Sequence, residues 1–161
     1  MRKYAIREPN KTDPAWIAPR LRVEDLKELE AAGLDPLEVL SRAHEASVVA
    51  LTVDILNPET GEMEPAVMGG VASYQEGVGH PWMLSTPLIE GLGISAAKEA
   101  RKWVSYMKEA YPVLSNFVHA KNKTARQWIE MVGFDFPDEP AVTLETGEDF
   151  VRFESRRPEH V

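Results

Sequence analysis

The sequence predicts an α+β fold with a mixed, mainly antiparallel sheet. Segments rich in β-branched residues and segments of helical spacing follow one another in the order strand, two helices, three strands, helix, strand, helix, two strands. The helix near residues 95–111 is long enough to be the crossover that a parallel strand pair requires. We therefore expect a central sheet of six to seven strands flanked by about four helices.

Length and composition indicate one domain over residues 1–161. Hydrophobic residues make up 43% of the chain and charged residues 27%, as in an ordinary globular protein. A net charge of -8 argues against direct nucleic-acid binding, which needs clustered Lys and Arg. The absence of cysteine excludes disulfides, thiolate catalysis and zinc-thiolate sites.

The sequence predicts neither a membrane span nor a signal peptide. Its longest apolar run, residues 48–53, is far shorter than the roughly 18 residues of a spanning helix. Arg2 and Lys3 are not followed by an apolar stretch. We therefore expect a protein that is cytosolic when it is made.

The N-terminal part reads as a strand followed by two helices. Residues 3–6 are the strand, and the prolines and polar residues of 9–14 predict a loop. Residues 22–32 have helical spacing, and Gly33 follows as a C-terminal cap. Asp35 as N-cap and Pro36 in the first turn begin a second helix that runs to about residue 45.

The middle of the chain predicts a hairpin and a short third strand. Residues 47–55 and 66–74 form the hairpin around a turn with Asn57, Pro58 and Gly61. Gly69 and Gly70 indicate a bulge or a close backbone approach in its second arm. We expect a loop over 75–80 and a strand over 82–85.

The C-terminal part alternates helices and strands. Residues 95–111 are the most regular helix, and 113–119 form a strand that can lie parallel to 82–85. A last helix runs from Asn122 to about Val132, with Gly133 as its cap. Residues 142–144 and 150–153 form a final hairpin, and residues 156–161 are expected to be a frayed tail.

Two segments resemble the GNAT superfamily of acetyl-coenzyme A-dependent acyltransferases. The first is Asn122, Ala125, Glu130, Gly133 and Phe134, which matches the superfamily pattern residue by residue. The second is 91–94, with Gly91, Gly93 and Ile94, which resembles the loop that holds the cofactor pyrophosphate. That loop normally begins with Arg or Gln, whereas Leu88 stands here and Glu90 adds a negative charge.

Several shorter motifs resemble a narrower group, the acetyltransferase-like morphogenesis proteins of short-tailed bacteriophages. They are residues 82–86, 116–118, 133–134 and 150–153, together with Trp128. The resemblance implies a role in virion assembly or as a virion-associated component. It also implies phage structural proteins as partners, and location in the host cytoplasm and in the virion.

The GNAT resemblance implies a site for acetyl-CoA. Backbone N–H groups at the start of the 95–111 helix suit a pyrophosphate, because they are unpaired donors at the positive end of the helix. The expected cofactor-binding residues are Ser85, Gly91, Gly93, Ile94, Ser95 and Asn122. Ser95 and Asn122 each have a second interpretation as an N-cap, worth about 1 kcal/mol for Asn122.

The set of catalytic residues that the GNAT resemblance implies is incomplete in this sequence. GNAT enzymes often place a Tyr, the acid for the departing thiolate, seven residues after the motif Asn, and here that position is Ile129. Tyr106, Tyr111 and Ser85 are the alternatives for this role. The resemblance therefore predicts a degraded catalytic site.

Candidate general bases are Glu76 and His80, before the third strand of the middle region, and His119 at the end of the next strand. No pair of histidines has metal-ligand spacing, so we expect no metal site. Trp103, Met107 and Trp128 have core-facing spacing and are expected to pack, although an exposed binding platform is the alternative.

Three functions follow, in order of preference. The first is a GNAT-fold phage protein in virion assembly with a degraded catalytic site. The second is an active acetyl-CoA-dependent N-acetyltransferase that modifies a host or phage protein. The third is a small-molecule acetyltransferase unrelated to phage.

Overall fold

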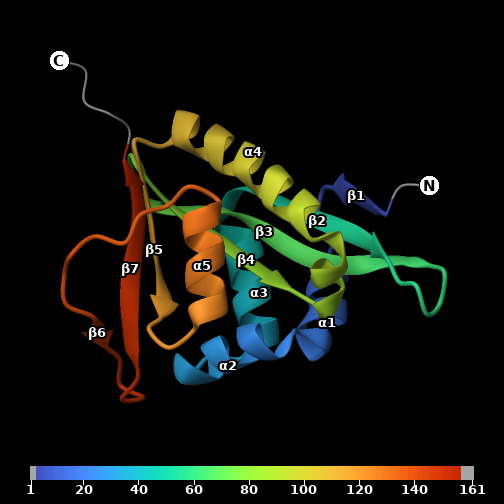
Figure 1. Ribbon diagram of the computed structural model, residues 1–161, viewed down its shortest axis with the longest axis horizontal. Coiled ribbons are helices and arrows are strands. Elements are labelled where there is room, and N and C mark those ends of the chain that lie inside the picture. Colours follow the sequence, from blue (N-terminus) through green and yellow to red (C-terminus); the bar gives the residue numbers. More distant parts are fainter. Residues whose placement is uncertain (1–2, 157–161) are drawn as a thin grey trace.

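The structure, a computed structural model that describes residues 3–156, is built on one seven-stranded sheet (Figure 1). The strands lie in the order β1-β2-β3-β4-β5-β7-β6. Neighbouring strands are antiparallel except for β4 and β5, which are parallel. The predicted fold class and the parallel pair are confirmed. The strands are β1 (Tyr4–Arg7), β2 (Ser47–Leu56), β3 (Met63–Gln75), β4 (Val78–Ser85), β5 (Val113–His119), β6 (Val142–Thr143) and β7 (Asp149–Arg156).

Five α-helices and two short 3-10 helices lie within residues 3–156. Four of the α-helices are the predicted ones. The fifth, α1, begins at Asp13, where the sequence predicted a loop, and that prediction is wrong for Asp13 and Pro14. Pro14 lies in the first turn of α1, and Ile17 is fully buried, so tertiary packing holds this helix of five residues. The helices are α1 (Asp13–Ile17), η1 (Ala18–Arg20), α2 (Val23–Ala31), α3 (Pro36–Ala46), η2 (Pro87–Leu92), α4 (Ile94–Ala110) and α5 (Lys123–Met131).

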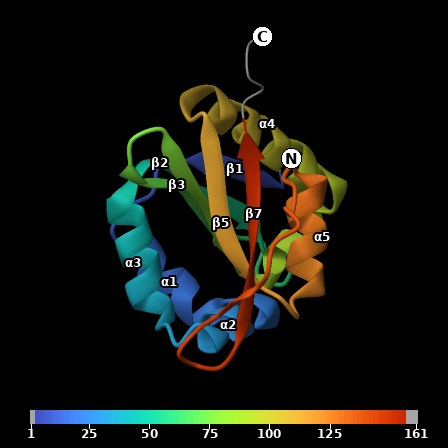
Figure 2. The same cartoon turned by 90° about the vertical axis from the view of Figure 1, so that its left-hand side faces the viewer.

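The helices cover the sheet in two layers. Figure 2 shows α1 and α3 on one side of the sheet and α4 and α5 on the other. Helix α2 lies across the end of the sheet at which β5 terminates (Figures 1 and 2). This placement of α2 brings its side chains to the carboxyl ends of β4 and β5.

Two strand boundaries differ from the predicted ones. β4 begins at Val78, so residues 78–80 belong to a strand and the predicted loop is wrong there. β7 continues to Arg156, which pairs with Val113, so the expected frayed tail does not include this residue. The rest of that tail, residues 157–161, lies outside the described part of the chain.

Gly69 and Gly70 mark a close backbone approach. A Cβ on Gly69 would lie 3.1 Å from the carbonyl oxygen of Trp82, and one on Gly70 would meet the carbonyl oxygen of Val49. The register shifts between β2 and β3 lie elsewhere, at Ser47/Val49 and Val53/Asp54. Of the two sequence alternatives, the close approach is therefore confirmed.

Candidate functional site

The parallel strands β4 and β5 pair briefly and then separate. Only Val78 with Val113 and Gly79 with Leu114 are paired. Gly79 permits this pairing, because a Cβ there would lie 2.7 Å from Cγ2 of Val71 and 2.9 Å from Cδ2 of Leu114. Beyond this point β5 continues to pair with β7, while β4 stays with β3. A cleft therefore opens between β4 and β5 toward their carboxyl ends.

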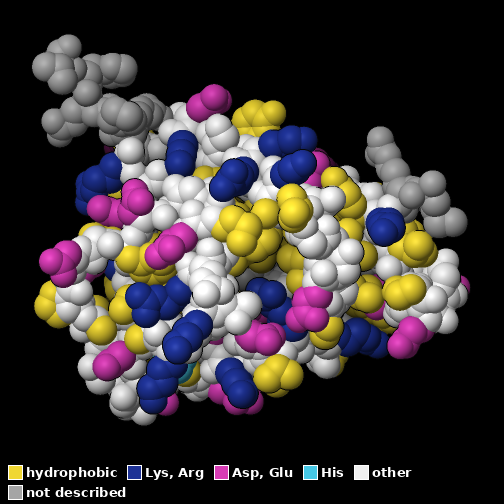
Figure 3. All heavy atoms as spheres, viewed as in Figure 1, with side chains coloured by type: hydrophobic (Ala, Val, Ile, Leu, Met, Phe, Trp, Pro, Cys, Tyr) yellow, Lys and Arg dark blue, Asp and Glu magenta, His cyan; other side chains and the backbone are white. Residues whose placement is uncertain are grey.

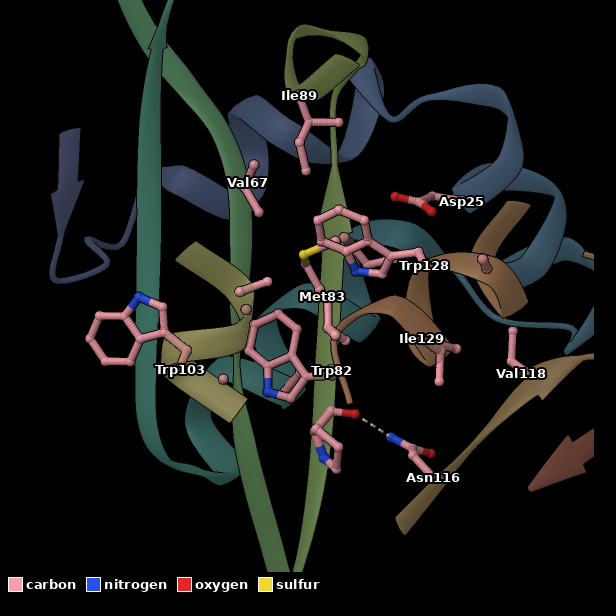
Figure 4. Close-up of a pocket in the computed structure, with 18 of the residues that line it drawn as sticks. Asp25, Val67, Trp82, Met83, Ile89, Trp103, Asn116, Val118, Trp128 and Ile129 are labelled. Carbon is pink, nitrogen blue, oxygen red and sulfur yellow. Dashed lines mark hydrogen bonds between the residues drawn. The ribbon is translucent and has the colours of Figure 1, made fainter. Parts of the chain in front are cut away.

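Pro81 lies where the two strands part. Asn116 Nδ2 donates to the carbonyl oxygen of Pro81 at 2.9 Å (Figure 4), and His80 Nδ1 lies 2.8 Å from the carbonyl oxygen of Ser115. The N and O of one strand residue point to the same side, so the nitrogen of Pro81 faces the cleft. A proline is tolerated at this position because no strand there needs its missing N–H.

A cavity of about 400 Å³ occupies the cleft and the space under α4. This volume is in the range of small-molecule sites. Its walls come from the sheet and from α2, α3, α4 and α5, and they are mainly apolar (Figure 4). Figure 3 shows hydrophobic side chains gathered around a hollow at the centre of this face, with charged side chains at its edge. The charged residues that line the cavity are Arg22, Asp25, Glu28 and Glu99.

Tryptophans form part of the walls. Trp103 of α4 and Trp128 of α5 line the cavity together with Met107 and with Trp82 of β4. Trp128 points from α5 into the cavity (Figure 4), and it also packs against the core, as does Met107. The expectation that these side chains only pack is therefore incomplete, because they also border open space.

Glu28 of α2 is hydrogen-bonded at the carboxyl end of β5. Its Oε1 accepts from the backbone N of His119 at 3.0 Å and from Nδ2 of Asn122 at 3.1 Å. No described residue hydrogen-bonds to its Oε2, and Glu28 lines the cavity. Burial raises the pKa of Glu28, although the bonds from His119 and Asn122 oppose this shift. A carboxylate with one free oxygen and a raised pKa suits proton transfer.

Asp25 is placed in the same way at the end of β4. Its Oδ2 accepts from the backbone N of Ser85 at 2.8 Å and lies 3.2 Å from Nε of Arg22. Burial raises the pKa of Asp25, and the charge of Arg22 opposes this shift. Because α2 is bonded to both strand ends through Asp25 and Glu28, it braces the wide end of the cleft.

The loop predicted to hold a pyrophosphate lies at the N-terminus of α4. Gly93 is the N-cap residue, with φ of 53°, a conformation that favours glycine. No side chain caps α4, so the interpretation of Ser95 as its N-cap is wrong. Nothing lies within 4 Å of a Cβ built on Gly91 or Gly93. The uncapped helix end is therefore open to a ligand.

Arg22 supplies a positive charge beside this loop. A small cavity of about 150 Å³ is lined by Arg22, Glu90, Gly93, Ala96 and three apolar residues. The Arg22 side chain is 13% exposed, and its Nε lies 3.2 Å from Oδ2 of Asp25, so Arg22 shares its positive charge with that carboxylate. An anion at the α4 N-terminus fits this arrangement, although Glu90 opposes it.

The other predicted cofactor residues are engaged within the protein. Ser85 is fully buried, with its Oγ 3.4 Å from Oδ2 of Asp25. Asn122 is the N-cap of α5, where its Oδ1 accepts from the backbone N of Ala125 at 3.1 Å, and its Nδ2 holds Glu28. Neither Ser85 nor Asn122 lines the cavity. Ile94 and Ser95, in the first turn of α4, do not line it either.

The three candidate bases are not brought together. Glu76 is exposed in the turn before β4, at the opposite end of the cleft from His119. His80 contacts Ser115, and His119 Nε2 lies 2.9 Å from Oε2 of Glu148. None of the three lines the cavity. The residues that do, Asp25 and Glu28, were missed, because spacing alone does not distinguish them from the other acidic residues of the chain.

Ile129 lines the cavity at the position where a GNAT enzyme often has its acid. Of the proposed substitutes, Tyr106 is 62% exposed, Tyr111 packs against the core and Ser85 is buried. None of these three lines the cavity. Among the described residues, the one tyrosine in its walls is Tyr4, whose hydroxyl donates to Oε1 of Glu99 at 3.0 Å.

Solved structures with this fold include acetyltransferases of the GNAT family. An acetyltransferase of the GNAT family from Bacillus anthracis superposes with a TM-score of 0.65 at 11% identity, over 96% of this chain and 95% of that one. Spermidine N-acetyltransferase from Vibrio cholerae, solved with CoA and spermine, gives 0.64 at 14% identity, over 96% and 95%. AAC(6')-Ib, solved with ribostamycin and coenzyme A, gives 0.65 at 18%, over 97% and 94%. The chain therefore has the GNAT fold.

Comparisons by sequence give no match, either to a family model or to a curated protein. Within residues 3–156, no helix is both long and apolar enough to cross a membrane. The same residues contain no group of three or more His, Cys, Asp or Glu side chains that could hold a metal ion.

Proposed function

We propose that the protein is an acyl-CoA-dependent N-acyltransferase. The observation that carries this proposal is the cleft between β4 and β5, which leads to the uncapped N-terminus of α4 beside the guanidinium of Arg22. Structures of this fold include proteins solved with CoA and an amine-containing compound. The same combination of an anion site and a narrow cleft suits the pyrophosphate and the pantetheine arm of a CoA thioester.

The residues that would hold CoA come from two parts of the chain. The backbone N–H groups of Ile94 and Ser95 and the guanidinium of Arg22 are the donors for the pyrophosphate. Arg22 replaces the Arg or Gln that usually begins the loop and is Leu88 here. The apolar edge of the cleft, with Met83 and Ile129, suits the pantetheine arm.

Glu28 is the general base of this proposal. Bound acyl-CoA supplies an acyl group as a thioester, and the net reaction converts this thioester and an ammonium group into an amide, coenzyme A thiol and a proton. Glu28 Oε2 accepts a proton from the ammonium, which exposes the nitrogen lone pair. Asp25, in the wall of the same cavity, holds Arg22 in place through their ion pair.

No described side chain at the cavity wall is placed like the usual tyrosine to protonate the departing thiolate. A thiolate is a tolerable leaving group, and water in the open cleft is an alternative proton source. We therefore expect slow rather than absent turnover, since general acid catalysis contributes about 10²–10⁴-fold.

The virion-assembly role remains a prediction from the phage resemblance. The structural neighbours are acetyltransferases, and nothing in the comparisons supports a phage virion protein or a degraded site. Phage structural partners and virion or host-cytoplasm location are likewise not tested. The N-acyltransferase alternative has the cavity, Arg22 and Glu28 in its support.

Two measurements test the proposal. Acetyl-CoA at 100 times its dissociation constant should add ~2.7 kcal/mol to the free energy of unfolding. Release of CoA thiol in the presence of a panel of amines is then followed with a thiol reagent, which has no protein background because the chain has no cysteine. Failure of CoA and acetyl-CoA to shift the melting temperature would overturn the proposal.

A further inference from the structure

The core on the α4 face of the sheet is interrupted at Gly69. Val67 belongs to one hydrophobic cluster and Val71 to another. Gly69 lies between them on the same face of β3, because alternate strand residues share a face. Its neighbours across the sheet are Leu51 of β2 and Met83 of β4. The sheet therefore leaves open space at this point, because Gly69 has no side chain.

Two small residues form part of the roof above this gap. Ala96 and Ala100 lie one helical turn apart on α4 and face the cavity, and Trp103 lines it at the next turn. Leu51 and Met83 are only partly buried, although both belong to interior strands of the sheet. Helix α4 therefore does not close down onto the sheet. We call this space the α4 chamber, and its walls are Leu51, Gly69, Met83, Ala96, Ala100 and Trp103.

The α4 chamber is apolar and continuous with the cleft. It belongs to the same cavity that is lined by Asn116 and Ile129. Tyr4 and Glu99 also line the cavity, and the Tyr4 hydroxyl donates to Oε1 of Glu99. Apolar cavities hold water poorly and bind apolar groups. An acetyl group, with one methyl beyond its carbonyl, leaves such a chamber unfilled.

The position of the α4 chamber favours the acyl donor as its occupant. Met83 and Ala96 line both this chamber and the small cavity that holds Arg22 and Gly93 at the pyrophosphate loop. The carboxylate that suits a cationic acceptor, Glu28, belongs instead to α2 at the wide end of the cleft. The donor is thus the substrate whose binding loop borders the chamber.

We propose that the α4 chamber binds the aliphatic chain of an acyl-CoA longer than acetyl-CoA. This inference rests on the proposed function and specifies its donor. The reaction is unchanged: the C–S bond of the thioester breaks, the C–N bond of the amide forms, and CoA leaves as the thiol. The chamber selects which acyl group is transferred.

Isothermal titration with CoA and with acetyl-, butyryl-, hexanoyl- and octanoyl-CoA tests the proposal. The dissociation constant should fall by about fourfold for each methylene that enters the chamber. Equal affinity for acetyl- and longer acyl-CoA, with CoA itself binding, overturns the chamber as an acyl site but leaves the proposed function intact. No binding of CoA or of any thioester overturns both.

A matched pair of variants locates the effect. Ala100→Leu fills the chamber and should remove the dependence on chain length while CoA binds as before; Ala110→Leu, at an exposed position of the same helix, should leave the dependence unchanged. The part of the tryptophan emission that is lost in Trp103→Phe gives a second readout, which should shift with octanoyl-CoA and not with CoA. A chain-length dependence that survives in Ala100→Leu, or that is found with alkylamines in place of thioesters, contradicts the proposal.

Discussion

Asn122 performs two separable tasks, and substitutions can divide them. Its Oδ1 caps α5 by accepting from the backbone N of Ala125, and its Nδ2 donates to Oε1 of Glu28. Asn122→Ser keeps a capping oxygen and removes the amide donor, whereas Asn122→Ala removes both. The two variants therefore separate the stability of the helix cap from the positioning of the proposed base.

The expected magnitudes follow from these two bonds. Loss of an N-cap costs about 1 kcal/mol. Loss of a hydrogen bond to a charged group costs about 1.5–3 kcal/mol. At neutral pH, Asn122→Ser should therefore lower the free energy of unfolding by about 1.5–3 kcal/mol, and Asn122→Ala by about 2.5–4 kcal/mol. Urea denaturation measures both values.

The effect on activity has a definite sign. Burial raises the pKa of Glu28 and the bond from Asn122 lowers it, so removing that bond raises the pKa further. The base then stays protonated up to a higher pH, and the acidic limb of the kcat/KM profile should move to higher pH in Asn122→Ser. The destabilisation is present above the folded pKa of Glu28 and shrinks as the pH falls below it, because the neutral carboxyl accepts a weaker bond.

One control variant and two possible outcomes test the roles assigned to Asn122. Asp35→Ser changes the cap of α3, whose side chain accepts from the backbone N of Glu38 at 3.0 Å, and should leave the pH profile unchanged. If Asn122→Ser loses stability and its acidic limb does not move, Glu28 is not the group that titrates. If the Ser and Ala variants are equally stable, the cap contributes nothing.

Four further substitutions test the site and the fold. Glu28→Gln should lower kcat by about 10²–10⁴-fold with CoA affinity unchanged. Because burial raises the pKa of Glu28, the wild type should lose stability relative to this variant as the pH rises through the folded pKa of Glu28. Urea titrations at several pH values measure this loss. Arg22→Gln should weaken CoA binding by about 10- to 100-fold in calorimetry and leave S-acetylpantetheine, which lacks the pyrophosphate, unaffected. Ile129→Tyr should raise kcat about tenfold or more in the thiol-release assay, and an unchanged kcat would show that the missing acid does not limit turnover. Asp13→Asn weakens a partly buried ion pair, in which the Arg7 side chain is 30% exposed and also bound to Asp54, and should cost about 1.5–3 kcal/mol in urea unfolding at neutral pH. Burial raises the pKa of Asp13, but the hydrogen bonds from Arg7, Asn10 and Thr52 lower it overall, so the wild-type advantage should be lost as the pH falls into the acidic range.

The regular elements were predictable because local sequence determines them. Asn122 and Asp35 cap helices as expected, and β-branched residues mark the long hairpin. The missed elements depend on tertiary contacts. α1 is only one turn long and is held by Ile17 in the core, and β4 continues through Gly79 and Pro81, which weaken a strand prediction.

The candidate site was predictable only in part. The loop around Gly93 is carried by consecutive residues, so its likeness to a pyrophosphate loop is visible in the sequence. Arg22, Asp25 and Glu28 are spaced three apart, which reads as an ordinary charged helix face. The place of these three residues in the candidate site depends on the position of α2 across the ends of β4 and β5, and no local pattern specifies that position.

Two features of the proposed donor site offset each other: a loop with little positive charge, and the apolar α4 chamber. Leu88 and Glu90 reduce the electrostatic attraction of the loop for a pyrophosphate, and Arg22 restores it only in part, because it is paired with Asp25. The α4 chamber offers apolar contact that does not depend on charge. A site of this kind gains donor affinity from the acyl chain as well as from the phosphates, so the affinity for octanoyl-CoA should fall less steeply with added salt than the affinity for CoA.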